Sequence, residues 1–257
     1  MAKFCTKCGK PLEEGMTCDC QSNVVEQQVN VAVAPQSTDT KIDIKESLMD
    51  CVNVFKKVFT KPFEAIKEFV CDSKFIAGII MIVVTALSNG LYKIASLKNT
   101  YEATANSLNL NDFSSLLNSA LSGNSAVAEP EYLKEFFTSF LTNFAEYAVV
   151  FVLGYLIISK LFKGTISWKQ MLNAVAISLS VVLVGNLLRA GLTFVDGDFI
   201  YNIRSYISSF ANIFSILLLY GATKEVSGID NNKMFISVAS MSVFATLVMD
   251  LVDKVLN

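Results

Sequence analysis

Histidine is missing from all 257 residues, and arginine occurs only twice, at Arg189 and Arg204. Without histidine the chain has no Ser-His or Cys-His dyad and no imidazole ligand for a metal. The phosphate-binding motifs Gly-x-x-x-x-Gly-Lys and Gly-x-Gly-x-x-Gly are also missing from the sequence. A net charge of −2 gives no electrostatic basis for binding nucleic acid. We therefore predict a protein that is not an enzyme and has no nucleic-acid partner.

Charged residues make up only 17% of the chain, whereas soluble domains contain about 25%. A helix that crosses a bilayer needs about 20 mostly apolar residues, and five stretches approach this length. The predicted spans are Phe75–Ile94, Glu146–Leu161 (extended back through Phe140), Met171–Leu188, Ile203–Tyr220 and Met234–Leu251. Five such runs exceed what the core of a soluble helical bundle can cover. We predict an all-α membrane protein with a five-helix transmembrane bundle over residues 75–257.

Basic residues are distributed unevenly between the two ends of these spans. Twelve lysines fall on the side of the N-terminus: Lys41, Lys45, Lys56, Lys57, Lys61, Lys67, Lys74, Lys160, Lys163, Lys169, Lys224 and Lys233. Five basic residues fall on the opposite side: Lys98, Lys134, Arg189, Arg204 and Lys254. Cytoplasmic loops are enriched in basic residues. We therefore predict a multi-pass protein of the cell membrane with a cytoplasmic N-terminus and an outside C-terminus.

Four of the six cysteines lie within residues 1–20. Four thiolates in so short a segment can complete a tetrahedral shell around zinc, and such a segment needs the metal in order to fold. A redox pair or disulfides are the alternatives, and disulfides are disfavoured in the cytoplasm. The predicted ligands of one structural zinc ion are Cys5, Cys8, Cys18 and Cys20. Residues 21–41 are polar and predict a flexible linker.

Residues 42–74 predict two helices that precede the first span. One helical face carries the apolar residues Ile44, Leu48, Cys51, Val52, Phe55 and Phe59, and lysines lie on the remaining surface. Pro62 ends this helix and begins a second, shorter one. The first helix suits either the cytoplasmic lipid surface or the cytoplasmic face of the bundle, and the two placements are compatible. Cys51 and Cys71 lie among apolar residues and are predicted to be packing residues.

Three stretches resemble known families. Phe4–Leu12 resembles the short zinc ribbon found at the N-terminus of many bacterial membrane proteins. Phe55–Ile66 resembles the proline-centred segment that precedes the first span of Yip-family membrane proteins, and Leu161–Leu172 is similar to that family's loop between the second and third spans. The resemblance covers about residues 45–255 and implies five spans with a cytoplasmic N-terminus. The Asp-Leu-Tyr-Gly-Pro motif of eukaryotic members is absent, and the combination of ribbon and bundle looks bacterial.

Ionisable residues mark the predicted outer ends of the spans. Lys93, Glu146, Arg189 and Asp250 come from four helices and are expected at a similar depth. Each can extend to the interface, or a pair can tie helices together; the favoured pairs join Arg189 to Glu146 or to Asp250. The outer loop Lys98–Phe136 is predicted to carry a short amphipathic helix around Leu108–Leu121.

Two classes of function fit these features. The first is a non-catalytic integral membrane adaptor or regulator, with a cytoplasmic zinc-binding module that contacts a protein partner and a bundle that contacts lipid. The second is a subunit of a small-solute or ion transporter or channel. The sequence shows no internal repeat of the kind common in transporters. A polar cavity through the bundle would favour transport. Oligomerisation is left open.

Overall fold

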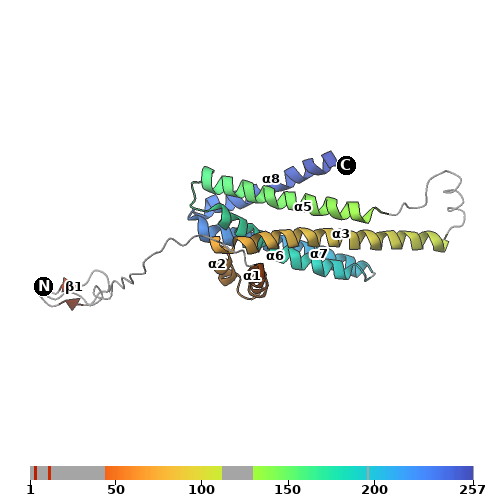
Figure 1. The fold of residues 1–257 in the computed structure, drawn as a ribbon, viewed down its shortest axis with the longest axis horizontal. Coiled ribbons are helices and arrows are strands. Elements are labelled where there is room, and N and C mark those ends of the chain that lie inside the picture. Colours follow the sequence, from red (N-terminus) through yellow and green to blue (C-terminus); the bar gives the residue numbers. More distant parts are fainter. Residues whose placement is uncertain (1–2, 5–10, 13–43, 112–129, 196, 257) are drawn as a thin grey trace. The chain divides into compact units, whose positions relative to one another are not determined.

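The computed structural model describes residues 3–4, 11–12, 44–111, 130–195 and 197–256 (Figure 1). The chain divides into two units, Met1–Lys41 and Ile42–Asn257, and each is described by itself. In the first unit, strand β1 (Lys3–Phe4) pairs antiparallel with strand β2 (Pro11–Leu12). Lys3 is opposite Leu12, and Phe4 is opposite Pro11. The predicted zinc ligands Cys5, Cys8, Cys18 and Cys20 lie outside the described residues.

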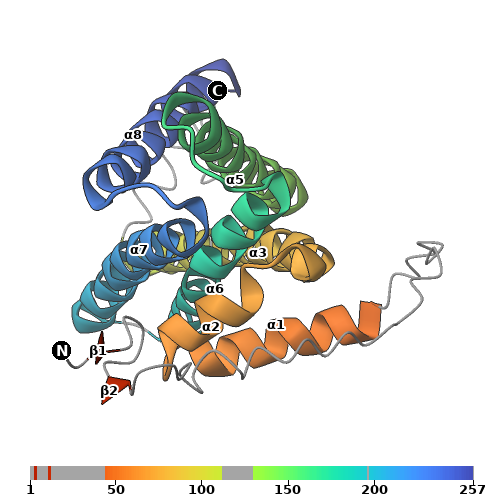
Figure 2. The same ribbon diagram turned by 90° about the vertical axis from the view of Figure 1, so that its left-hand side faces the viewer.

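The described part of the second unit consists of helices joined by short connections. Its elements are α1 (Ile44–Val58), α2 (Pro62–Phe69), the 3-10 turn η2 (Asp72–Lys74), α3 (Phe75–Asn111), α5 (Tyr132–Tyr155), the π-helical turn η3 (Leu156–Leu161), α6 (Trp168–Leu192), α7 (Asp198–Ser227) and α8 (Asn231–Leu256). The long helices α3, α5, α6, α7 and α8 run along a common direction, whereas α1 lies crosswise to them (Figures 1 and 2). We call the end of the bundle next to α1 and α2 the α1 end, and the opposite end the far end.

Helix α6 is the centre of the bundle, with α3 and α7 packed against it, α5 against α3, and α8 against α5. Its N-terminus is closed by a capping box, in which the Ser167 side chain accepts from Gln170 N and the Gln170 side chain accepts from Ser167 N. Small residues such as Ala174, Ala176 and Ser180 are fully buried along α6. Small side chains let neighbouring backbones approach closely, which is how helices associate in lipid.

Four helices in the described part are long and apolar enough to cross a membrane: Asp72–Ala103, Tyr132–Leu161, Trp168–Leu192 and Phe199–Ser227. The prediction of an all-α membrane protein is confirmed to this extent. The fifth predicted span, Met234–Leu251, falls within α8, where nothing is described of the side chains from Met249 onward. The fifth span therefore stays a prediction.

Two helices extend beyond the predicted spans. The helix of the second span begins at Tyr132, ahead of the predicted start near Phe140, and α3 continues to Asn111, past the predicted end at Ile94. The predicted outer loop Lys98–Phe136 is therefore helical at both ends, and of its predicted amphipathic helix the part beyond Asn111 lies outside the described residues. Hydropathy falls where polar residues begin, but a helix continues until glycine, proline or a cap interrupts it. Neither glycine nor proline occurs between Leu91 and Asn111.

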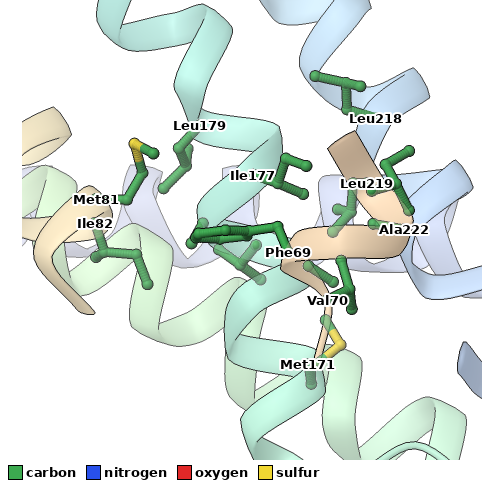
Figure 3. Close-up of a cluster of buried hydrophobic side chains, with 14 of the residues drawn as sticks. Phe69, Val70, Met81, Ile82, Met171, Ile177, Leu179, Leu218, Leu219 and Ala222 are labelled. Atoms are coloured by element: carbon green, nitrogen blue, oxygen red, sulfur yellow. The ribbon is translucent and has the colours of Figure 1, made fainter. Parts of the chain in front are cut away.

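Helices α1 and α2 pack on the α1 end of the bundle. Cys51, Val54 and Val58 of α1 are buried, and α1 contacts α3. At the end of α2, Phe69 and Val70 lie among buried side chains of α6 and α7 (Figure 3). The predicted placement of the first helix on the bundle is thus confirmed. Its contact with lipid stays a prediction.

Candidate functional site in the helical bundle

Polar side chains recur at three- or four-residue spacing along the long helices, which places them on one face of each helix. Ser208, Asn212 and Ser215 form such a set on α7, and Ser242 and Thr246 another on α8. These faces meet around a cavity of about 500 Å³. Its other polar lining residues are Asn89 of α3, Asn143, Glu146 and Tyr147 of α5, and Ser178, Asn186 and Arg189 of α6.

A chain of hydrogen bonds joins three helices along the cavity. Asn186 Nδ2 of α6 donates to Asn89 Oδ1 of α3 over 2.7 Å, and Asn89 Nδ2 donates to the Tyr147 hydroxyl of α5, also over 2.7 Å. Within hydrocarbon, a polar side chain without such a partner is costly. The chain therefore both satisfies these groups and fixes the rotation of α3, α5 and α6 relative to one another.

The predicted ion pair between Arg189 and Glu146 is wrong. Arg189 Nη2 donates to the Tyr92 hydroxyl over 2.8 Å, and its guanidinium carbon lies 4.0 Å from the centroid of the Tyr92 ring. Arg189 and Glu146 line the same cavity without approaching within salt-bridge distance. The rotation of α6 about its axis directs Arg189 toward α3. Lys93 of α3 lies 3.8 Å from Glu135 of α5. The side chain of Asp250 lies outside the description, so its predicted pairing stays a prediction.

Buried sulfur-containing and aliphatic side chains fill the bundle between this cavity and the α1 end. Met171 of α6 and Met241 of α8 are fully buried. Both are the nearest neighbours of Gly154, the single glycine of α5, where an added Cβ would collide with them. Along α6 the cavity lining runs from Val175 to Arg189, about 21 Å at 1.5 Å per residue. The cavity thus occupies the middle and far parts of the bundle and is closed at the α1 end.

The predicted metal site stays a prediction, whereas the two remaining cysteines, Cys51 and Cys71, lie within the described residues. Among the described residues no group of histidine, cysteine, aspartate or glutamate could hold a metal, but the four predicted ligands are not among them. Cys51 is buried, and its thiol donates to the Ala77 carbonyl over 3.4 Å. Burial, reinforced by the neighbouring Asp50 carboxylate, raises the pKa of the Cys51 thiol to about 11. The interpretation of Cys51 as a packing residue is confirmed, and Cys71 is partly buried.

The cavity itself was not predicted, although the sequence carries a signal for it. Each polar residue of the spans looks like an isolated interruption in a hydropathy profile. Their spacing, as in Ser208, Asn212 and Ser215, indicates a polar face on a helix that must turn away from lipid. The spacing does not show which polar helix faces meet in the folded bundle.

Comparison with known proteins identifies the bundle. The Yip1 domain matches residues 56–251, which include all four membrane-spanning helices and most of α8. No curated protein and no solved structure matches the chain. The Yip1 family is not known for enzymatic activity. Because this match covers most of the chain, the protein belongs to the Yip1 family of membrane proteins.

Proposed function

We propose that this protein is a non-catalytic membrane adaptor or regulator whose N-terminal zinc-binding module contacts a protein partner in the cytoplasm. The observation that carries the proposal is the attachment of α1 to the bundle. Lys74 Nζ at the start of the first span lies 2.6 Å from Asp50 Oδ1 of α1, and Cys51 and Val54 of the same helix are buried. The chain that precedes Ile44 is therefore joined to the bundle through a helix held in place.

The outer surface of α1 supports contact with lipid. Its large exposed apolar residues are Ile44, Leu48, Met49 and Val52. Lys45, Lys56 and Lys57 belong to the same helix. A helix with an apolar strip and lysines, lying crosswise to the spans (Figure 2), suits the headgroup region of a membrane with anionic lipids. We place it on the cytoplasmic side of the cell membrane, as the distribution of lysines predicts.

The zinc-binding module is proposed to use Cys5, Cys8, Cys18 and Cys20 as ligands of one structural ion. The pairing of β1 with β2 supports this proposal. Strand β1 ends directly before Cys5, and strand β2 begins directly after Lys10. Residues that flank the Cys5-x-x-Cys8 pair are therefore close in space, as in a zinc knuckle.

Affinity purification from membranes tests the adaptor function. The full chain would be compared with a Cys5→Ser/Cys8→Ser variant, and a Cys71→Ser variant would serve as the matched control because Cys71 lies outside the module. We expect specific partners to be lost from the double variant and retained by the control. Recovery of the same partners by all three chains would contradict the proposal.

A second candidate function is a subunit of a small-solute or ion transporter or channel. It is supported in part by the polar cavity of about 500 Å³, which is closed at the α1 end and so does not run through the bundle. Ser215 lines this cavity, whereas Ile213 on the same helix is exposed on the outside of the bundle. In proteoliposomes that report proton and potassium flux, transport predicts that Ser215→Phe lowers the flux and Ile213→Phe does not. Equal flux in liposomes with and without protein would remove this candidate for those ions.

A further inference from the structure

The two arginines of the sequence line one cavity at the far end of the bundle. Its volume is about 330 Å³, within the range of about 300–1,000 Å³ typical of small-molecule sites. Arg189 comes from α6 and Arg204 from α7, and Tyr92, Ser96 and Asn99 of α3 complete much of the lining. Every residue of this lining is neutral or positively charged. Glu146 lines the adjoining 500 Å³ cavity, which shares Arg189 and Ser208 with this one.

Each arginine has a buried nitrogen without an acceptor. Nε of Arg189 and Nε of Arg204 are buried and make no hydrogen bond within the described residues. Arg189 uses Nη2 on the Tyr92 hydroxyl, and Arg204 lies 5.8 Å from the centroid of the Tyr201 ring, so tyrosines position both guanidinium groups. A buried charged donor that lacks an acceptor is costly. Neither arginine forms an ion pair with a carboxylate of the described residues, so two uncompensated guanidinium groups line one cavity, which suits an anionic ligand.

The depth of the cavity indicates where that ligand would lie. Arg189 is about 32 Å along α6 from its start at Trp168, at 1.5 Å per residue. The hydrocarbon core of a bilayer is about 30 Å thick. Arg189 therefore lies near the level of the headgroups at the far end, where phosphate groups of lipids and phosphate from solution can both reach it.

We propose that Arg189 and Arg204 bind a phosphate group, carried either by a phospholipid headgroup or by free inorganic phosphate. The guanidinium group presents a planar fork of N–H donors that matches phosphate oxygens in pairs, whereas a lysine ammonium acts as a point charge. Every other basic residue of the chain is lysine, so arginine occurs only at this cavity. Ser96 and Asn99 can donate further hydrogen bonds to the same oxygens.

Ligand binding by the full chain in neutral detergent tests the site. The three probes are short-chain phosphatidic acid, the diacylglycerol with the same acyl chains, and inorganic phosphate. Affinity is measured by native mass spectrometry and by the shift in thermal unfolding. We expect the wild type to bind phosphatidic acid or phosphate and not diacylglycerol. Binding of phosphatidic acid alone identifies a lipid phosphate, and binding of inorganic phosphate alone identifies a soluble anion.

Conservative variants show whether the arginines are responsible. Each of Arg189→Lys and Arg204→Lys keeps the charge and is expected to weaken binding roughly tenfold. Lys93→Gln is the matched control, because Lys93 lies near the same end but outside the lining and beside Glu135. If Arg189→Lys loses its helical circular dichroism, the binding measured for Arg204→Lys alone tests the proposal. Binding of neither phosphate-bearing probe, or equal binding by Arg204→Lys and the wild type, would overturn the proposal.

Discussion

Asp50 of α1 and Lys74 of η2 form a partly buried ion pair, with 2.6 Å between Oδ1 and Nζ. The pair joins the crosswise helix to the first residues of the first span, 24 positions later in the sequence. It stands out from the exposed lysine–glutamate pairs of α2, because its side chains keep only 20% and 29% of their surface in contact with solvent. The position of α1 on the bundle thus depends on a specific contact as well as on apolar burial.

We predict that Asp50→Asn lowers the free energy of unfolding by about 1–2 kcal/mol, because it leaves Lys74 partly buried without its anion. Thermal unfolding in detergent measures the change. Glu64→Gln is the control, since the Lys61–Glu64 pair is exposed and its loss is expected to cost less than about 0.5 kcal/mol. Equal effects of the two variants would show that the Asp50–Lys74 pair does not hold α1.

Gly154→Ala is predicted to destabilise the bundle by roughly 1–3 kcal/mol. An added Cβ would collide with Met171 Cε and Met241 Sδ, and both methionines are fully buried. Gly191→Ala, in α6, meets nothing within 4 Å and is expected to be neutral or slightly stabilising. Chemical denaturation of the two variants checks the contrast. A tolerated Gly154→Ala would mean that the methionines can move aside.

The thiol of Cys51 is predicted to resist alkylation at neutral pH. With a pKa of about 11, only on the order of one molecule in a thousand carries the thiolate at pH 8. Maleimide reaction is followed in a chain in which the other five cysteines are serine, with Cys71 as the single thiol of the control. Rapid labelling of Cys51 at pH 7 would contradict its burial.

The raised pKa of the Cys51 thiol also makes the free energy of unfolding depend on pH. The folded-state pKa of Cys51 lies above the ordinary value of 9.0, so folding favours the neutral thiol. The stability that comes from burying the neutral thiol is fully present below pH 9 and is lost as the pH rises to about 11. Cys51→Ala removes the titrating group, so its unfolding temperature is expected to fall less steeply than that of the wild type across this window.

Reporter fusions test the number of spans. We predict a cytoplasmic signal at Asn23 and Gly164 and an outside signal at Asn257. Four helices qualify as spans within the described residues, and α8 would be the fifth. A cytoplasmic signal from Asn257 together with one from Gly164 would mean that α8 does not cross the membrane.

Elemental analysis of the purified chain is predicted to find one zinc ion, lost in a variant with Cys5→Ser and Cys8→Ser. Chelation is expected to unfold the N-terminal module and to leave the unfolding temperature of the bundle unchanged, because Met1–Lys41 and Ile42–Asn257 are separate units. A metal-free chain, purified under reducing conditions with zinc supplied, would contradict the proposed site.

The bundle as a whole was predictable from sequence. Long apolar runs identify the positions of the spans, and the segments Phe55–Ile66 and Leu161–Leu172 indicate the Yip family, which the match over residues 56–251 confirms. Pro62 begins the second pre-membrane helix as predicted. The sequence does not locate the helix ends at the far end, because hydropathy falls near Ile94 whereas α3 continues to Asn111.

By itself, the sequence determined which segments are helical, which of them are apolar enough for lipid, and on which face of each helix the polar residues lie. These are local properties, since they depend on composition and on the helical period of 3.6 residues. Only the tertiary structure decided that Arg189 meets Tyr92 rather than Glu146, and that five polar faces surround one cavity. The rotation of each helix about its axis is set by packing against residues distant in the chain, such as the small buried residues of α6.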